Sequence, residues 1–225
     1  MKPRQLNGYW CWQDTEGATE VRFVGRGPGA TPEAALAAIA PSVHQLAWLR
    51  QVHSAEAVSA AVGDCGEADA LTTDQPGLAL TVATADCVPV LLSSGSSLAA
   101  IHAGWRGLAE SIIAKTLTRM TAEPAQLTAW IGPAIGPCCY EVGFEVAQLV
   151  ARASNPIVVL PGSGSKPHLD LQAAASIQLS SSGVTDIRTV AGCCHCDEER
   201  LWSHRRDAPR AGRNRAIAWL RAKQP

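Results

Sequence analysis

The longest apolar stretch of the chain, residues 77–92, is broken in its middle by Asp86 and Pro89. A membrane-spanning helix needs about 20 consecutive apolar residues, so this stretch is too short and too polar at its centre to cross a bilayer. Its two halves, residues 78–83 and 88–92, are short apolar runs flanked by turn-forming residues, which is typical of β-strands. We therefore expect no membrane-spanning segment and a fold that contains short strands.

The same pattern recurs along the chain and alternates loosely with helical segments. Further strands are predicted for residues 21–24, 98–102, 127–131, 157–160 and 187–191. Helices are predicted for residues 32–40, 108–120, 145–153, 169–180 and 213–222. The segment 108–120 carries the clearest helical signal, an apolar face, whereas alanine richness supports several of the others. That face consists of Leu108, Ile112, Leu117 and Met120. We predict an α/β or α+β fold with a mixed sheet.

Length and charge limit the class of protein. A chain of 225 residues fits one globular domain of roughly 100–250 residues, and no repeat or linker divides it. We therefore expect a single domain over residues 1–225, and a monomer. The formal net charge of −1 provides no electrostatic footprint for nucleic acid or for an anionic membrane, so neither is an expected partner.

Eight cysteines and six histidines stand out in a chain with only two methionines. The N-terminal segment lacks the apolar core and cleavage site of a signal peptide, so we expect a cytoplasmic location, where thiols stay reduced. Adjacent cysteines at 138–139 and 193–194 also disfavour a disulfide framework. The segment Cys193-Cys194-His195-Cys196 suggests a metal site, but no partner cluster is evident in the sequence, and we do not predict one there.

Three residues, His53, Cys87 and His102, each lie at the end of an apolar stretch and just before a turn. Strand ends commonly carry functional side chains, because a rigid scaffold holds the residue while the loop shapes the pocket. Two imidazoles and one thiolate bind Zn²⁺ and leave a fourth position for water. The long gaps between the three residues match no zinc-finger pattern and suit a catalytic site assembled from separate strands. The alternative is that they are core residues with satisfied ring nitrogens.

Ordered motifs run from Gln51 to about Trp219. They are Glu67-Ala-Asp69-Ala-Leu-Thr72-Thr73, Ala83-Thr-Ala-Asp86-Cys87-Val-Pro89, His102-Ala-Gly-Trp-Arg-Gly107, Ile131-Gly-Pro-Ala-Ile-Gly-Pro-Cys-Cys-Tyr-Glu141-Val142, and Ser203-His-Arg205-Arg206-Asp207 followed by Gly212-Arg213. Together these motifs resemble the YfiH family. Its members carry the names polyphenol oxidase or laccase, purine nucleoside phosphorylase and peptidoglycan editing factor.

The resemblance implies a mixed α/β sandwich of the YfiH type, with a zinc site made by His53, Cys87 and His102. It also implies phosphorolysis of adenosine, inosine, guanosine and methylthioadenosine, together with deamination of adenosine. A purine nucleoside and phosphate are then the expected partners. Copper is a second candidate ion, because it outcompetes zinc at a site of two histidines and one thiolate.

Phosphorolysis requires a cationic site for phosphate, and Arg106 is the first candidate, as a catalytic and substrate-binding residue. It directly precedes the clearest predicted helix, which would place a guanidinium beside free N-terminal amides. Further substrate-binding candidates are Arg205, Arg206, Arg213 and Glu141, of which Glu141 is a candidate acid or base. Asp86 would face away from Cys87 on a strand, so we expect it to shape a turn or support the ligands.

The chain departs from the family's pattern in its N-terminal part. Residues 1–50 are shorter and more divergent than in relatives, and within them Arg26 is the position we match to a motif arginine. Ser54 stands where glycine is common after the motif histidine. Because this region contributes to the pocket in relatives, the departure bears on substrate preference and on full activity.

Two other enzyme functions remain as alternatives. A metal-independent hydrolase or amidase would use Cys87 as a thiolate nucleophile and His53 or His102 as its base, and would act on peptidoglycan precursors. A copper-binding polyphenol oxidoreductase is the other, although a multicopper oxidase normally uses His-x-His pairs and no two histidines here lie two residues apart. A purely structural zinc is disfavoured, because structural sites are usually closed by four protein ligands.

Overall fold

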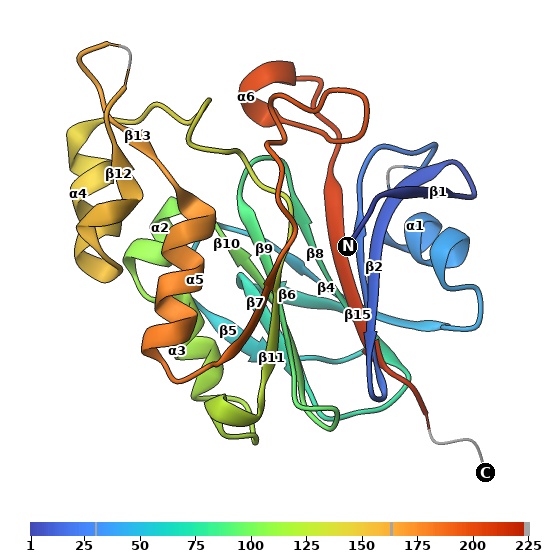
Figure 1. Ribbon diagram of the computed structural model, residues 1–225. Coiled ribbons are helices and arrows are strands. Elements are labelled where there is room, and N and C mark those ends of the chain that lie inside the picture. Colours follow the sequence, from blue (N-terminus) through green and yellow to red (C-terminus); the bar gives the residue numbers. More distant parts are fainter. Residues whose placement is uncertain (30, 163, 223–225) are drawn as a thin grey trace.

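Two β-sheets lie face to face in this computed structural model, which describes residues 1–29, 31–162 and 164–222 (Figure 1). Within that described part, the larger sheet has seven strands in the order β1-β2-β3-β15-β8-β4-β6. Their bounds are β1 (Arg4–Leu6), β2 (Tyr9–Glu16), β3 (Thr19–Val24), β4 (Gln45–Arg50), β6 (Gly63–Glu67), β8 (Leu78–Thr84) and β15 (Asn214–Leu220). Strand β4 runs parallel to β6 and β8, and the other neighbours are antiparallel.

The smaller sheet has six described strands in the order β14-β11-β9-β10-β7-β5. Their bounds are β5 (Ala57–Ser59), β7 (Ala70–Thr73), β9 (Val88–Ser93), β10 (Leu98–Ala103), β11 (Thr128–Ile131) and β14 (Asp186–Thr189). The pairs β11–β14 and β5–β7 are parallel and the rest antiparallel, so both sheets are mixed. A short hairpin joins β12 (Val159–Leu160) to β13 (His168–Leu169).

Helices cover the outer faces of the two sheets and complete a four-layer sandwich (Figure 1). Helix α1 (Pro32–Ile39) lies on the larger sheet. The side of the smaller sheet carries α2 (Trp105–Ala109), α3 (Ile112–Leu117), α4 (Phe144–Ala153) and α5 (Leu171–Ser181). The connections also contain the short 3-10 helices η1 (Pro124–Gln126) and η2 (Pro156–Val158) and the short α-helix α6 (His204–Asp207). The described helices include none with the length and hydropathy to cross a membrane.

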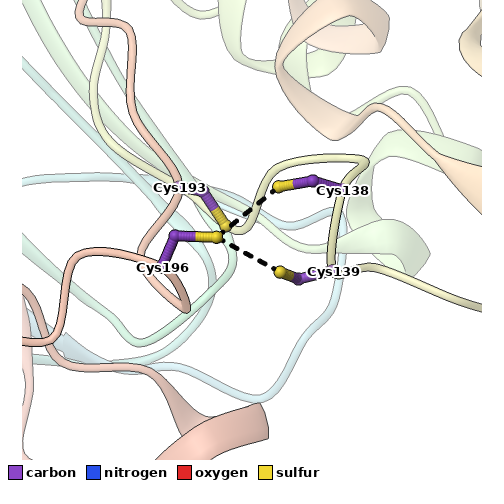
Figure 2. A group of neighbouring side chains, drawn as sticks. All are labelled: Cys138, Cys139, Cys193 and Cys196. Carbon is purple, nitrogen blue, oxygen red and sulfur yellow. Dashed lines mark hydrogen bonds between the residues drawn. The ribbon is translucent and has the colours of Figure 1, made fainter.

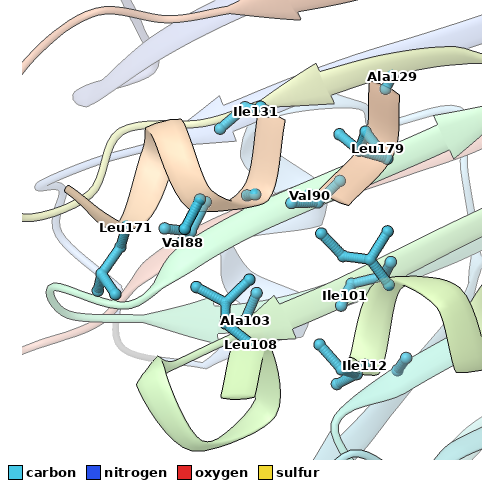
Figure 3. Close-up of a cluster of buried hydrophobic side chains, with 14 of the residues drawn as sticks. Val88, Val90, Ile101, Ala103, Leu108, Ile112, Ala129, Ile131, Leu171 and Leu179 are labelled. Carbon is cyan, nitrogen blue, oxygen red and sulfur yellow. The ribbon is translucent and has the colours of Figure 1, made fainter. Parts of the chain in front are cut away.

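Hydrophobic clusters fill the spaces between the layers. On β9, Val88 and Val90 face the helices, whereas the next residue, Leu91, faces the larger sheet. Figure 3 shows the helix-side cluster, to which Ile101 of β10 and Leu179 of α5 also contribute. Central strands are therefore buried on both faces, which is why they read as continuous apolar runs.

The predicted class, an α/β fold with mixed sheets, is confirmed. Strands predicted at 21–24, 78–83, 88–92, 98–102, 127–131 and 187–191 coincide with β3, β8, β9, β10, β11 and β14, and helices predicted at 32–40, 145–153 and 169–180 coincide with α1, α4 and α5. The segment 157–160 is only partly a strand, because it begins within η2 and continues as β12.

The helix predicted at 213–222 is wrong, because these residues form β15 between β3 and β8. Ala216 and Ala218 face the space between the sheets, while Ile217 and Trp219 face the α1 side. The true period is therefore two rather than 3.6. Alanine richness was misleading, since a small side chain also suits a strand pressed between two layers.

The helix predicted at 108–120 is interrupted. Helix α2 ends at Ala109, Ser111 adopts a left-handed φ of 61°, and α3 begins at Ile112. The predicted apolar face is nevertheless buried as expected; it comprises Leu108, Ile112, Leu117 and Met120. The interruption changes the chain direction while keeping those side chains in the core.

Candidate active site

The three predicted ligands meet where the chain passes from one sheet to the other. His53 lies in the connection from β4 to β5, and Cys87 in the connection from β8 to β9; both connections cross from the larger sheet to the smaller one. His102 lies on β10, where it is the register partner of Pro89 on β9. The topology thus brings together residues that are distant in the sequence.

The side chains of His53, Cys87 and His102 converge. Each offers one ligand atom, and these atoms all lie within 4.8 Å of one another. The two imidazole rings meet edge to face, with centroids 4.9 Å apart and planes at 81°. Gly104 leaves room for this arrangement, since a Cβ there would lie 3.1 Å from the Cys87 Sγ and 3.2 Å from the His53 ring.

Asp69 organises the group although no predicted role was given to it. Its buried carboxylate lies 2.7 Å from Nδ1 of His102 and accepts the backbone N–H groups of Val52, His53 and Ser54. Those three bonds hold the turn in which His53 has a left-handed φ of 59°, a conformation that is costly for a non-glycine residue. Engagement of Nδ1 leaves Nε2 of His102 as the ligand atom.

Ser54 adds to this network. Its hydroxyl donates to the Asp69 carboxylate at 2.9 Å, in addition to the bond from its backbone N–H at 2.6 Å. A glycine at this position would provide only the backbone bond. The Ser54 hydroxyl therefore adds to the support of the site.

Electrostatics favour a thiolate at Cys87. Burial opposes its ionisation, but hydrogen bonds and charge from His102 and His53 outweigh burial and lower its pKa from 9.0 to about 6. Burial likewise disfavours a charged His102, yet Asp69 and Cys87 raise its pKa to about 9. Two nitrogens and an anionic sulfur at this spacing fit a metal such as zinc, with three protein ligands and one open position.

A cavity of about 520 Å³ opens above these side chains, a size in the range of small-molecule sites. Three of the predicted arginines, Arg106, Arg205 and Arg213, line it. Asp86 is the acidic residue in the described lining, and its carboxylate accepts the backbone N–H of Arg205 at 2.6 Å. The walls therefore carry an excess of positive charge.

Arg106 is placed differently from the expectation. It lies inside α2, a helix of 5 residues that Gly104 precedes, rather than before a long helix. So short a helix offers no strong N-terminal anion site, because the dipoles of few peptide units add up there. Its guanidinium lies 4.5 Å from the ring centroid of Trp105. The positive charge at the cavity wall therefore comes from the arginine side chains rather than from the N-terminus of α2.

Two predicted arginines do not line the cavity. Arg206 is bound by the Asp207 carboxylate and donates to the carbonyls of Cys194, His195 and Leu201. Arg26 also pairs with Asp207, at 2.9 Å, and stacks over Trp202. These contacts give both guanidinium groups a structural role in the C-terminal loop.

The predicted substrate-binding residue Glu141 does not line the cavity, and it supports the site only through its backbone. Its carbonyl accepts hydrogen bonds from the Arg205 guanidinium at 3.2 and 3.3 Å. The same guanidinium lies 5.3 Å from the ring centroid of Tyr140. The loop that carries these two residues is thereby joined to α6.

Further lining residues were quoted in motifs or stood beside them without an assigned role. Gln51 joins the ends of β4 and β8, since its amide bonds both the N–H and the carbonyl of Ala83 at 2.7 Å. Tyr140 and His204 bring a phenol and an imidazole into the cavity. Their positions inside motifs were the available signal, but separation in sequence concealed their convergence.

Fold and site together define a mixed α/β sandwich protein with a candidate metal centre of two histidines and one cysteine. Residues 29–221 match the family described as multi-copper polyphenol oxidoreductase laccase. The chain belongs to this family, which is also known as the YfiH family.

Relatives with curated names support an enzyme. A Xylella fastidiosa protein named purine nucleoside phosphorylase is 39% identical over 189 residues, which cover 77% of this chain and 71% of the relative. An Escherichia coli protein named purine nucleoside phosphorylase YfiH is 36% identical over 182 residues, with 77% and 73% covered. A Streptomyces coelicolor protein with the phosphorylase name is 36% identical over 209 residues, with 88% and 85% covered.

Solved structures share the fold. The crystal structure of the Neisseria meningitidis protein NMB0706 has a TM-score of 0.84 and 30% identity, and the match covers 96% of this chain and 100% of that one. A Bacillus licheniformis protein named YfiH has a TM-score of 0.85 at 23% identity, with 97% and 99% covered, and shows the fold alone.

Proposed function

We propose that this protein is a zinc-dependent purine nucleoside phosphorylase with adenosine deaminase activity, working as a cytoplasmic monomer. Its substrates would be adenosine, inosine, guanosine and methylthioadenosine, with phosphate as co-substrate. One observation carries the proposal: a single cavity holds His53, Cys87 and His102 together with three arginines. The names of the relatives agree with the phosphorylase part.

The arginines provide for phosphate. Guanidinium groups bind phosphate oxygens in pairs and stay charged at all physiological pH values. In phosphorolysis a phosphate oxygen forms the new bond to C1 of the ribose, and the purine leaves with its bonding electron pair and takes up a proton. Arg106, Arg205 and Arg213 would hold the phosphate for this step, while His204 and Tyr140 offer hydrogen-bond donors to the sugar or base.

His53, Cys87 and His102 would hold the zinc ion. When bound, zinc with an open position acts as a Lewis acid and lowers the pKa of water towards about 7, which is the chemistry that deamination of adenosine needs. Asp69 fixes the ring of His102 through Nδ1, and it fixes the backbone of His53. Copper fits the same ligand set, so the metal is part of the test.

The test compares product formation with and without phosphate. We expect purified protein to release ribose 1-phosphate and free base from adenosine or inosine only when phosphate is present, and to release ammonia from adenosine. Chelation should abolish both reactions and added zinc should restore them. Turnover that ignores phosphate and survives chelation contradicts the proposal.

Arg106→Gln tests the phosphate site. Loss of a hydrogen bond to a charged group costs about 1.5–3 kcal/mol, so the KM for phosphate should rise about tenfold or more. Arg119→Gln is the matched control, since Arg119 is exposed and lies outside the cavity lining. Equal KM values for phosphate in the two variants would show that Arg106 does not bind phosphate.

A metal-independent Cys–His hydrolase is the second candidate, and the lowered pKa of Cys87 favours it. A thiolate beside an imidazolium is the arrangement of a cysteine nucleophile. Because Cys87→Ala would abolish activity in either case, chelation and phosphate dependence distinguish the two functions. Stoichiometric copper with an intense blue absorption would instead favour the polyphenol oxidoreductase.

A further inference from the structure

Four cysteines outside the candidate active site form a second cluster. Cys138 and Cys139 lie in the loop that follows β11, and Cys193 and Cys196 in the loop that follows β14. Their sulfur atoms all lie within 4.8 Å of one another. Figure 2 shows the sulfurs of the first loop pointing toward those of the second. The expectation that Cys193–Cys196 lacks a partner cluster is therefore wrong.

Strand pairing explains why the two loops meet. Strands β11 and β14 are parallel neighbours, so the loops that follow them leave the same edge of the smaller sheet. Beyond the strands, Ala134 and Cys193 form a β-bridge, and the Cys194 N–H donates to the Ala134 carbonyl at 2.9 Å. Gly136 permits the close approach, because a Cβ there would lie 3.2 Å from the Cys193 Cβ and 3.3 Å from the Cys138 Sγ.

The sulfur spacing suits four-thiolate coordination. Zinc binds thiolates at about 2.3 Å, and a regular tetrahedron of that radius has edges of about 3.8 Å. The Sγ of Cys196 lies 3.8 Å from that of Cys138 and 3.4 Å from that of Cys139. The adjacent cysteines do not prevent this, since the turn that begins at Gly136 directs both sulfurs to Cys196 (Figure 2).

Backbone groups support the cluster as they would support bound thiolates. The Gly136 N–H donates to the Cys193 sulfur at 3.2 Å, and hydrogen bonds of this kind stabilise the ionised form of an acceptor. The Cys193–Cys196 loop is a tight turn, closed by the Cys196 N–H on the Cys193 carbonyl at 3.1 Å. Arg206 fixes it from behind through the carbonyls of Cys194 and His195.

A disulfide describes the cluster less well. The Cys196 sulfur contacts two cysteines of the other loop rather than one, and 3.4 Å exceeds the S–S bond length of about 2.05 Å. A disulfide would also require an oxidant, whereas binding of a divalent ion only releases the thiol protons. A tetrahedral set of four sulfur ligands is typical of zinc or of iron–sulfur centres, and zinc requires no redox chemistry or inorganic sulfide.

We propose that Cys138, Cys139, Cys193 and Cys196 form a second, closed metal site that binds zinc and fastens the two loops together. The site is independent of His53, Cys87 and His102 and of the proposed reaction. Its place in the fold gives it a structural purpose. The first loop continues to Tyr140 and the second leads to Arg205, which both line the cavity and contact each other.

Metal analysis of a variant that lacks the candidate active-site metal centre of His53, Cys87 and His102, here called the first site, tests the proposal. His53→Ala/Cys87→Ser removes two of the three ligands of the candidate active site and leaves the four cysteines intact. We expect this variant to keep about one equivalent of zinc after extensive dialysis, as a closed structural site does. Its cobalt-substituted form should show the strong thiolate-to-cobalt charge-transfer absorption of a four-sulfur site.

Variants of the cluster provide the complementary measurement. Adding Cys193→Ser/Cys196→Ser to the first-site variant should remove the remaining zinc and the cobalt signal. Cys65→Ser, a half-buried cysteine outside both groups, should leave both unchanged. The proposal is overturned if the first-site variant is folded and contains no zinc. This holds whether alkylation shows the four clustered cysteines to be free thiols or peptide mapping shows a disulfide between two of them.

Discussion

At the scale of single residues, Asp69 determines how the candidate active site is arranged. One buried carboxylate bonds Nδ1 of His102 and three successive backbone N–H groups around His53. Burial disfavours its charge, but the bonds from His102 and Ser54 outweigh burial and hold its pKa below the usual value. Asp69 therefore remains an acceptor at neutral pH and fixes two of the three ligands at once.

Asp69→Asn should weaken metal binding without removing a ligand. An amide can accept from fewer donors than a carboxylate and does not stabilise a charged imidazole, and loss of such a supporting group typically lowers metal affinity about 10–100-fold. Competition with a chelator on the first-site metal measures the change. Asp64→Asn is the matched control, because Asp64 is exposed and, within the described residues, its side chain bonds Gly66 and Arg50 alone. Equal affinities would show that Asp69 does not support the site.

At the scale of elements, Ser111 separates α2 from α3. Its φ of 61° is left-handed, and its side chain makes no capping hydrogen bond to the helix that follows. This break explains why one continuous helix was the wrong expectation for residues 108–120. The periodicity of apolar residues predicts which side chains are buried. It does not show where a single residue such as Ser111 ends one helix and begins the next.

Ser111→Gly should stabilise the protein. The left-handed conformation costs a non-glycine residue roughly 1–2 kcal/mol, so we expect a gain of about 1 kcal/mol in the free energy of unfolding. Lys115→Gly, on the exposed face of α3, should instead cost about 1 kcal/mol, because glycine is a poor helix former there. Chemical denaturation of the two variants gives both values. A loss of stability in Ser111→Gly would contradict this account of the break.

At the scale of the whole molecule, the contact between the two sheets positions the site. The connections β4–β5 and β8–β9 cross from one sheet to the other and carry His53 and Cys87. Packing between the sheets, where Leu91 is fully buried, therefore sets the distance between those two connections and β10. Stability and site geometry depend on the same interior.

Leu91→Ala should destabilise the sandwich strongly. A buried leucine replaced by alanine typically costs about 2–5 kcal/mol, because transfer free energy is lost and a cavity remains. Leu149→Ala on α4, whose leucine is 44% exposed, should change stability by less than about 0.5 kcal/mol. Equilibrium unfolding measures both, and similar losses would mean that the space between the sheets is not a principal part of the core.

Sequence patterns predicted the interior strands because those strands are apolar on both faces. Strands with mixed composition escaped prediction, such as β2 with its half-buried Gln13 and β4 with Gln45 and Arg50 at its ends. The polar residues in these strands weaken the apolar signal, although other residues of both strands are buried. The alanines of β15 gave the opposite error, since alanine is compatible with either period.

The sequence by itself determined the class of fold, the family, and the residues His53, Cys87 and His102 as candidate ligands. These properties are local or carried by ordered motifs, so they can be read from the chain directly. Only the tertiary structure decided which arginines line the cavity, that Asp69 organises the ligands, and that Cys138 and Cys139 meet Cys193 and Cys196. Those relations depend on sheet pairing between segments far apart in the chain, and no local pattern records which strands become neighbours.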